Sequence, residues 1–159
     1  MPPSHPEIDE TQTIRLILPR DANHYGTLYA GTLLELALAA AYATAHQAAG
    51  SSANLVLKRV LDLRCHQPVP VGSVVEIRGR ELRRSSAQIT VGLMGSPLPG
   101  STVPWMDAIM QFVHVDAQGR PDHLPDPGPD QDEPEVFDTE WLSLSSRAQS
   151  LARVRSESL

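Results

Sequence analysis

The sequence predicts an α+β domain in which one long helix lies on the face of an antiparallel sheet. Three observations lead to this prediction. A proline-free stretch of about twenty residues carries many good helix formers, one short alternating segment comes before it, and several alternating segments with short connections follow it. Because strands with short connections pair antiparallel, we expect the helix to cover one face of their sheet.

The predicted helix runs from about Leu28 to Ala49, and Gly50 suits its C-terminal cap. Leucines and alanines cover nearly its whole circumference, which is typical of a helix buried on most sides. A membrane span is the competing interpretation, since about twenty residues can cross a bilayer. Glu35 and His46 argue against a span, because a charge at the centre of a bilayer is costly. We therefore expect the core of a soluble domain.

The expected strands lie on both sides of this helix. Alternating apolar and polar residues mark them, and proline, glycine and serine mark the turns between them. The first strand after the helix carries an expected β-bulge near Arg59. The expected strands are 13–18, 55–65, 74–80, 87–93 and 106–115.

Length, charge and cysteine content bound the class of protein. The chain has 159 residues, enough for one domain with a proper core, and a net charge of −6. That charge makes nucleic acid and anionic membranes unfavourable partners. Cys65 is the only cysteine, so no intrachain disulfide and no cysteine-based zinc site can form. The N-terminus lacks the pattern of a signal peptide, so we expect a cytoplasmic protein.

The two ends of the chain differ in composition from its middle. The first residues are polar and rich in proline, and the segment after Arg120 is acidic and rich in proline, so neither buries enough to fold alone. Beyond it, Trp141, Leu144 and Ala148 share a helical stripe that needs a partner surface, in the same subunit or in a neighbour. The expected segments are a flexible arm at 1–12, the domain at 13–120, an acidic proline-rich tether at 121–137 and an amphipathic helix at 138–159.

The segment that leads into the long helix is the strongest candidate for a functional site. Residues 23–27 are rich in turn formers. Free backbone N–H groups at a helix start, with the positive end of the helix dipole, favour developing negative charge. Glu35 lies about one turn into the helix, and a carboxylate beside an anion site suits acyl-transfer chemistry. The alternatives are structural roles, a carboxylate that makes a structural hydrogen bond for Glu35 and an Asx-turn for Asn23.

Three blocks of the sequence resemble the hot dog superfamily of acyl-CoA thioesterases, in the order found in that family. Residues 21–31, Asp-Ala-Asn-His-Tyr-Gly-Thr-Leu-Tyr-Ala-Gly, are similar to the loop that enters the central helix. Residues 66–75 are similar to the Pro-Val-x-x-Gly-Asp strand turn, and Arg-Ser-Ser follows at 84–86. Residues 107–120 resemble the closing strand and turn of the short bacterial acyl-CoA hydrolases.

The resemblance implies a hot dog fold, in which an antiparallel sheet wraps around one long central helix. It also implies a homodimer or larger homo-oligomer, with active sites between subunits that hydrolyse an acyl-CoA or another acyl thioester near the helix start. No metal and no bound organic cofactor are expected, because coenzyme A is part of the substrate.

The chain departs from this family at one position of the helix. The resemblance places Leu38 where these hydrolases usually carry an aspartate that activates water or attacks the thioester, and a leucine can do neither. Some hot dog thioesterases use a glutamate in this helix, and one type pairs it with a threonine eight residues earlier. Thr27 and Glu35 have that spacing, and His66 loosely matches the partner histidine of that type.

The candidate residues have distinct expected roles. Glu35 is the expected general base or nucleophile, Asn23 is expected to orient water or donate to the carbonyl oxygen, and Thr27 is expected to assist them. Glycine allows close backbone approach, so the amides of Gly26 and Gly31 are candidate oxyanion donors. The expected substrate-binding residues are Gly26, Tyr29 and Gly31 near the acyl group, His66, and Ser85 and Ser86 at the coenzyme A tail.

Two alternative functions remain open at this stage. A non-catalytic acyl-CoA-binding or dimer-forming domain is favoured by Leu38 and disfavoured by the threonine and acid at the helix start. A hydratase or dehydratase needs a histidine–carboxylate pair over the acyl chain. His24 and Glu35 are the only nearby pair, and the residues around them do not resemble that motif.

Overall fold

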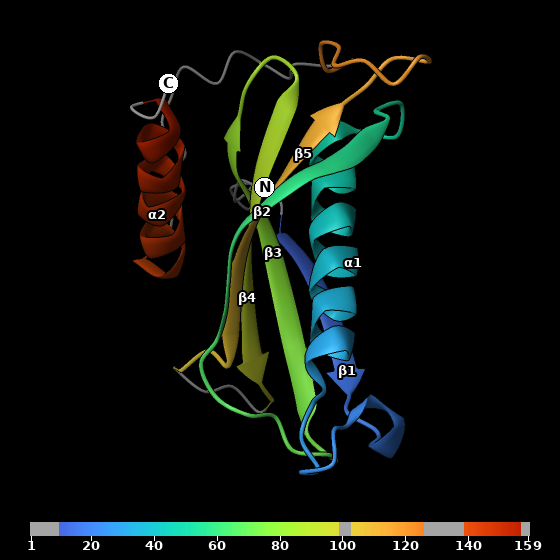
Figure 1. The fold of residues 1–159 in the computed structure, drawn as a ribbon, viewed down its shortest axis with the longest axis vertical. Helices are drawn as coiled ribbons and strands as arrows, with labels where there is room; N and C mark the ends of the chain where they lie inside the picture. The colour runs from blue at the N-terminus through green and yellow to red at the C-terminus, as the bar shows by residue number, and fades with distance from the viewer. Residues whose placement is uncertain (1–9, 99–102, 126–138, 157–159) are drawn as a thin grey trace, which may run out of the picture.

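A computed structural model describes residues 10–98, 103–125 and 139–156 of the chain (Figure 1). Within these residues one antiparallel sheet of five strands lies between two helices, which confirms the predicted α+β class. In chain order the elements are β1 (Glu10–Leu16), a 3-10 turn (Pro19–Asp21), α1 (Ala30–Ala49), β2 (Leu55–Cys65), β3 (Val74–Arg84), β4 (Gln88–Pro97), β5 (Met106–His114) and α2 (Thr139–Ser156).

The strand order in the sheet is β1-β3-β4-β5-β2, so β1 and β2 are its edges. Every neighbouring pair of strands is antiparallel. The register of β2 against β5 shifts between Leu57 and Arg59 and again between Val60 and Asp62. The first shift is the bulge expected near Arg59, and such bulges bend a strand and increase its twist. They help this side of the sheet to curve around α1.

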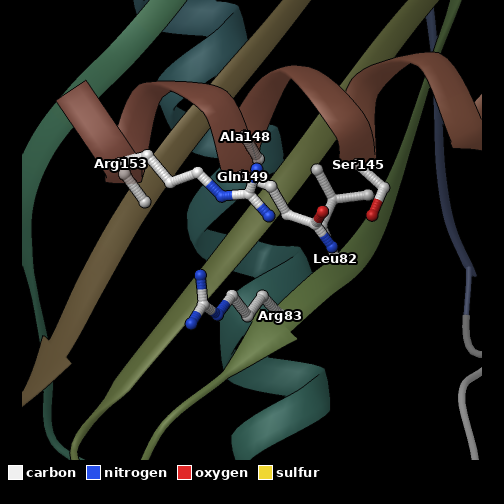
Figure 2. A pocket seen from close by; sticks show the side chains of 7 residues that line it. Leu82, Arg83, Ser145, Ala148, Gln149 and Arg153 are labelled. Atoms are coloured by element: carbon white, nitrogen blue, oxygen red, sulfur yellow. The ribbon is translucent and has the colours of Figure 1, made fainter.

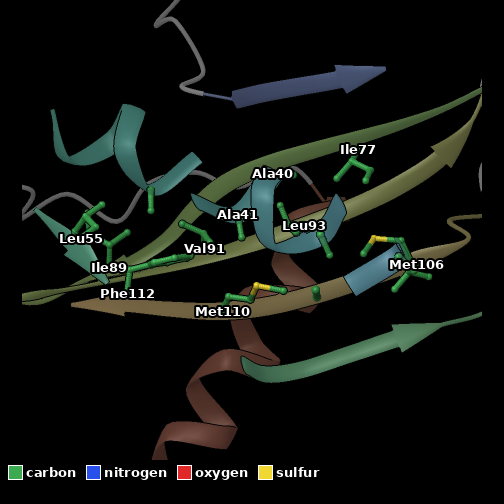
Figure 3. Packing of buried hydrophobic residues seen from close by; sticks show 14 of the residues in the cluster. Ala40, Ala41, Leu55, Ile77, Ile89, Val91, Leu93, Met106, Met110 and Phe112 are labelled. Carbon is green, nitrogen blue, oxygen red and sulfur yellow. The ribbon is translucent and has the colours of Figure 1, made fainter. Parts of the chain in front are cut away.

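α1 packs on one face of the sheet through small side chains, and the strands supply the large ones (Figure 3). A helix surface made of alanine approaches a sheet closely, and the larger strand residues then fill the interior to the usual density. The buried alanines of α1 are Ala37, Ala40, Ala41, Ala45 and Ala49. Facing strand residues in the same cluster include Ile77, Ile89, Val91, Leu93, Met110 and Phe112.

A close approach between α1 and the sheet lies at Gly79 on β3. A Cβ atom at this position would stand 2.0 Å from Thr44 Oγ1 and 2.7 Å from Thr11 Oγ1. The Thr44 hydroxyl donates to the Ala40 carbonyl oxygen at 2.8 Å, so in the 2.5 Å contact between the two threonines Thr11 is the donor. Gly79 thus makes room for a polar link between α1 and the edge strand β1.

α2 covers the opposite face of the sheet, as Figure 1 shows. Trp141, Leu144 and Ala148 form a second apolar cluster with strand residues such as Ile109. Arg147 also ties α2 to the sheet through ion pairs with Asp62 and Asp107. The partner surface that the helical stripe required is therefore provided by the sheet of the same chain.

The folded domain extends beyond the predicted limits of 13 and 120 at both ends. β1 begins at Glu10, inside the expected arm, because residues 10–12 pair with residues 78–80 of β3. Leu124 lies inside the expected tether, yet it is buried in the main core and its amide donates to the Ser86 carbonyl at 2.8 Å. The other residues of the expected arm and tether, 1–9 and 126–137, lie outside the described residues.

The hairpin of β3 and β4 is longer than the alternation pattern predicted. β3 continues to Arg84 past a register shift, and β4 continues to Pro97. Gly95 lies beyond the predicted end of this strand at 93, but it belongs to β4, as does Gly92. Side chains from outside β4 occupy the space where their Cβ atoms would be, Leu82 against Gly92 and Trp105 against Gly95. These glycines therefore serve packing between neighbouring elements.

α1 is not buried on most sides within one subunit, contrary to the sequence prediction. Its outward face exposes Leu34, Leu38 and Tyr42, each at 40% or more, together with Glu35. The all-round apolar pattern is present, but the chain's own sheet covers only one side of it. None of the described helices is long and apolar enough to span a membrane.

We expect Gly79→Ala to lower the free energy of unfolding by about 1–3 kcal/mol, because the added methyl group overpacks the contact with Thr44. Urea denaturation measures this change. Thr44→Ala removes the atom nearest to the added methyl group. The double variant is therefore expected to lose less unfolding free energy than the two single variants lose together. A Gly79→Ala protein as stable as the wild type would contradict the close approach.

Candidate active site

The start of α1 presents free backbone donors. Tyr29 is the N-cap residue and supplies no side-chain cap, and the first intrahelical hydrogen bond runs from Leu33 N to Tyr29 O at 2.9 Å. The amides of residues 30–32 therefore precede the hydrogen-bond ladder of the helix. Together with the positive end of the helix dipole, they favour a negatively charged group at this position.

Asn23 shapes the turn that leads to this helix start. Its Oδ1 accepts hydrogen bonds from the amides of Tyr25 at 2.9 Å and Thr27 at 3.2 Å, which is the Asx-turn considered as the alternative. Its Nδ2 donates to Thr27 Oγ1 at 3.0 Å and keeps its second hydrogen for another acceptor. Gly26 completes the turn with a φ of 74°, a conformation that favours glycine. The structure thus brings Asn23, Gly26 and Thr27 together.

Asp21 holds this turn in place, a role that the sequence analysis did not assign. Its buried carboxylate accepts hydrogen bonds from Leu18 N at 2.9 Å and from Arg15 Nη2 at 3.2 Å. Its backbone oxygen accepts the Tyr29 amide at 2.8 Å. The Leu18 amide, with the Arg15 charge, lowers the pKa of Asp21 below its usual 3.8, although burial acts in the opposite direction. Asp21 therefore connects β1, through its ionised carboxylate, to the helix start, through its backbone oxygen.

Tyr29 and Gly31 are in contact. A Cβ atom on Gly31 would stand 2.5 Å from Cε1 of the Tyr29 ring, so the ring lies back over the first turn of α1. Just over half of the Tyr29 side chain is exposed. An exposed aromatic ring therefore lies beside the free amides, and its contact with an acyl group stays a prediction.

Glu35 lies one turn after Gly31 on the exposed face of α1. Its carboxylate makes no hydrogen bond or ion pair with another residue of the described part of the chain. Leu34, Leu38 and Tyr42 flank it on the same face. The carboxylate is thus available to a ligand or to a second subunit.

His66 belongs to a different cluster. Its Nε2 lies 2.7 Å from Asp107 Oδ2, and Asp107 also bonds to Arg147 of α2. Arg147 in turn pairs with Asp62 at 3.0 Å. This ionic network faces α2, and the described hydrogen bonds of the His66 side chain go to it rather than to Asn23 or Thr27. Among the described residues, no three His, Cys, Asp or Glu side chains gather as a metal site would require.

Ser85 and Ser86 lie beside the far end of α1. The adjacent Arg84 donates from Nη2 to the Ala48 carbonyl at 2.7 Å, which places the β3–β4 turn next to the last turn of the helix. A helix of 20 residues is about 30 Å long at 1.5 Å per residue. Within one subunit, the two serines are therefore about one helix length from the helix start.

Sequence comparison identifies no relative of this chain. No protein-family model matches it, and no curated protein matches it.

Solved structures do match. A hexameric acyl-CoA thioesterase, determined without ligand, superposes with a TM-score of 0.77 at 23% identity over 95% of this chain and 93% of that one. An acyl-CoA hydrolase from Staphylococcus aureus was determined with butyryl coenzyme A, coenzyme A and coenzyme A disulfide. It superposes with a TM-score of 0.74 at 20% identity over 95% of this chain and 92% of that one. A hexameric thioesterase from Yersinia pestis superposes with a TM-score of 0.62 at 26% identity over 72% of this chain and 93% of that one. The chain therefore has the hot dog fold seen in acyl-CoA thioesterases, as the sequence predicted.

We expect Asp21→Asn to lower the free energy of unfolding at pH 7, because Arg15 loses its charged partner. The pKa of Asp21 is lowered in the folded state, so its stabilisation is present well above pH 3.8 and is lost as the pH falls through the folded pKa. Urea denaturation at pH 7 and at pH 3 should therefore show a smaller difference for Asp21→Asn than for the wild type. Asp122→Asn changes an exposed carboxyl and is the control. An identical pH dependence of Asp21→Asn and wild type would refute the role of Asp21.

Proposed function

We propose that this protein hydrolyses an acyl-CoA, or another acyl thioester, to the free acid and the thiol. The start of α1 carries this proposal, because uncapped amides, the Asn23–Thr27 turn and the carboxylate of Glu35 follow one another there. The similarity of the fold to acyl-CoA thioesterases, one of them determined with butyryl coenzyme A, supports it.

In the proposed mechanism the thioester carbonyl lies over the helix start. Its oxygen accepts hydrogen bonds from the Gly31 amide and from the second hydrogen of Asn23 Nδ2. Glu35 takes a proton from a water molecule, whose oxygen attacks the carbonyl carbon, and the amides stabilise the oxyanion that forms. The C–S bond then breaks, and the thiolate leaves and takes up a proton. The reaction needs no metal, and coenzyme A takes part only as half of the substrate.

The exposed surfaces of the subunit support assembly with a second copy. β2 is an edge strand of 11 residues and exposes Val56, Leu57 and Val60. A long apolar edge strand left open invites aggregation unless another chain pairs with it. Pairing of two β2 strands around a two-fold axis extends the sheet and covers both exposed α1 faces. Similar structures are described as hexameric, which supports a homo-oligomer.

Assembly also explains how the β3–β4 turn can serve the substrate. Ser85 and Ser86 are about one helix length from the helix start of their own subunit, too far to share a thioester site with it. In the proposed dimer, the turn of one subunit lies closer to the helix start of the other. The two serines therefore contact coenzyme A only in the partner's site, and a monomer has no complete site.

A non-catalytic acyl-CoA-binding or dimer-forming domain is the second candidate function. Leu38 favours it, because this position carries no acid and Leu38 is 40% exposed on the outward face of α1. The free donors at the helix start serve binding as well as catalysis. Turnover by the wild type separates the two functions, since a binding domain retains coenzyme A without releasing thiol from any acyl-CoA.

We expect Glu35→Gln to lower kcat by about 10²–10⁴-fold with little change in KM, because the amide keeps the shape but cannot accept a proton. Thiol release from a panel of short, long and aromatic acyl-CoAs measures both constants. Glu76→Gln on β3 is the matched control and should retain wild-type kcat. If Glu35→Gln retained the wild-type kcat, Glu35 would have a structural role and not a catalytic one. Leu38→Asp, checked for folding by circular dichroism, tests whether the acid usual in this fold raises kcat.

We expect at least a dimer in solution, with a mass of at least twice the 17.3 kDa of one chain. Light scattering coupled to gel filtration measures the mass at micromolar concentration. Val60→Lys on the β2 edge should weaken association, because lysine on an edge strand opposes pairing. Val154→Lys on α2 makes the same change at another exposed valine and should leave the mass unaltered. A monomeric wild type would contradict the shared site.

A further inference from the structure

A groove lies between the C-terminal half of α2 and the outer face of the sheet (Figure 2), on the side away from α1. It consists of two hollows of about 540 Å³ and 220 Å³. Arg83, Ala148 and Ala152 line both hollows, so the two adjoin. The larger volume is within the range of about 300–1,000 Å³ that small-molecule sites occupy. Ser85, which is proposed to contact coenzyme A in a partner's site, lines the edge of the smaller hollow, whereas the larger hollow contains no residue of the proposed thioester site.

The lining of the groove is positively charged although the protein is acidic. Arg59, Arg83 and Arg153 contribute side chains to it, and no Asp or Glu of the described residues does. The chain as a whole carries a net charge of −6. A cluster of one sign in a concave site concentrates ligands of the opposite sign. The groove therefore selects anions.

Arg59 is a fixed donor in the smaller hollow. Its Nε donates to Gln111 Oε1 at 2.8 Å, and Gln111 Nε2 donates to Thr90 Oγ1 at 3.4 Å. This chain of hydrogen bonds holds the guanidinium group in position. Its Nη1 is buried and has no acceptor among the described residues. Buried donors are normally paired, so Nη1 is a donor suited to a ligand oxygen.

Arg83 supplies a second donor to the same hollow, and among the described residues its side chain is unpaired whereas that of its neighbour Arg84 is paired. Arg84 forms an ion pair with Glu81 at 2.7 Å and donates a hydrogen bond to α1, so its charge is balanced within the chain. The Arg83 side chain makes no hydrogen bond or ion pair with any other described residue. Figure 2 shows its guanidinium group below α2, facing the same space as the Gln149 side chain.

We propose that this groove binds an organic phosphate through Arg59 and Arg83, at a site separate from the thioester site. Guanidinium groups match phosphate oxygens in pairs, and such charge-assisted hydrogen bonds are stronger than neutral ones. The remaining lining includes Leu61, Leu82 and Ala148, an apolar surface for the ring or chain that carries the phosphate. The ligand therefore needs both parts, a phosphate for the arginines and an apolar body for this surface.

Titration calorimetry of the full chain with ADP tests the proposal, with adenosine and inorganic phosphate as probes of the two parts. ADP is expected to bind saturably, and each part alone is expected to bind at least about tenfold more weakly. Arg83→Ala should raise the Kd for ADP by about tenfold or more, since a charged hydrogen bond is lost. Arg120→Ala removes the same charge from an exposed turn outside the groove and should change the Kd by less than about twofold.

Gln149→Glu provides a second variant that keeps the size of an exposed α2 side chain and adds a negative charge to the groove. It should weaken ADP binding as Arg83→Ala does, with an unchanged circular dichroism spectrum. ADP binding that neither variant affects, or inorganic phosphate that binds as tightly as ADP, would overturn the proposal.

Thioester hydrolysis by Arg83→Ala decides whether the two sites are separate. We expect kcat and KM for acyl-CoA to stay at wild-type values. A KM that rises by the same factor as the Kd for ADP would assign the groove to the coenzyme A part of the substrate and overturn the separate site. ADP binding is measured without acyl-CoA, so a protein without thioesterase activity would still pass or fail this test.

Discussion

The contact of α1 with the sheet through small residues is the constraint on which the rest of the structure depends. Ala41 and Ala45 are completely buried, and β3 meets the same helix with Gly79, where a Cβ atom does not fit. A helix that lies this close to a sheet has little freedom to slide or tilt, because interiors are close-packed. Both ends of α1 are therefore placed, its start by the backbone of Asp21 and its end by Arg84.

The placement of α1 creates the candidate active site at its start. Tyr29 precedes the helix without capping it, so the first amides stay available, and the buried carboxylate of Asp21 holds the preceding turn. The outward face of α1 then presents Glu35 among exposed apolar residues, with no partner for it among the described residues of its own chain. A carboxylate and an apolar stripe on one exposed face are features of an incomplete site, which connects the proposed chemistry to the proposed assembly.

The two faces of the sheet have different chemistry. The face under α1 is an apolar core, whereas the face under α2 combines a small apolar cluster with ion pairs and an arginine-lined groove. Strand geometry produces this division, since successive side chains point to opposite faces. Arg84 thus reaches α1 while Arg83 lines the groove, and Asp107 joins His66 and Arg147 on the α2 side.

The sequence by itself determined the fold class, the order of the elements and the candidate turn before α1, because periodicity, turn residues and helix propensity are local properties. The tertiary structure decided the rest. It placed Gly95 inside β4, drew Leu124 into the core and paired His66 with Asp107. Each of these outcomes depends on side chains that are distant in sequence and meet only after folding. The burial of α1 shows the same limit, since its pattern marks a helix covered on most sides while one subunit covers a single side.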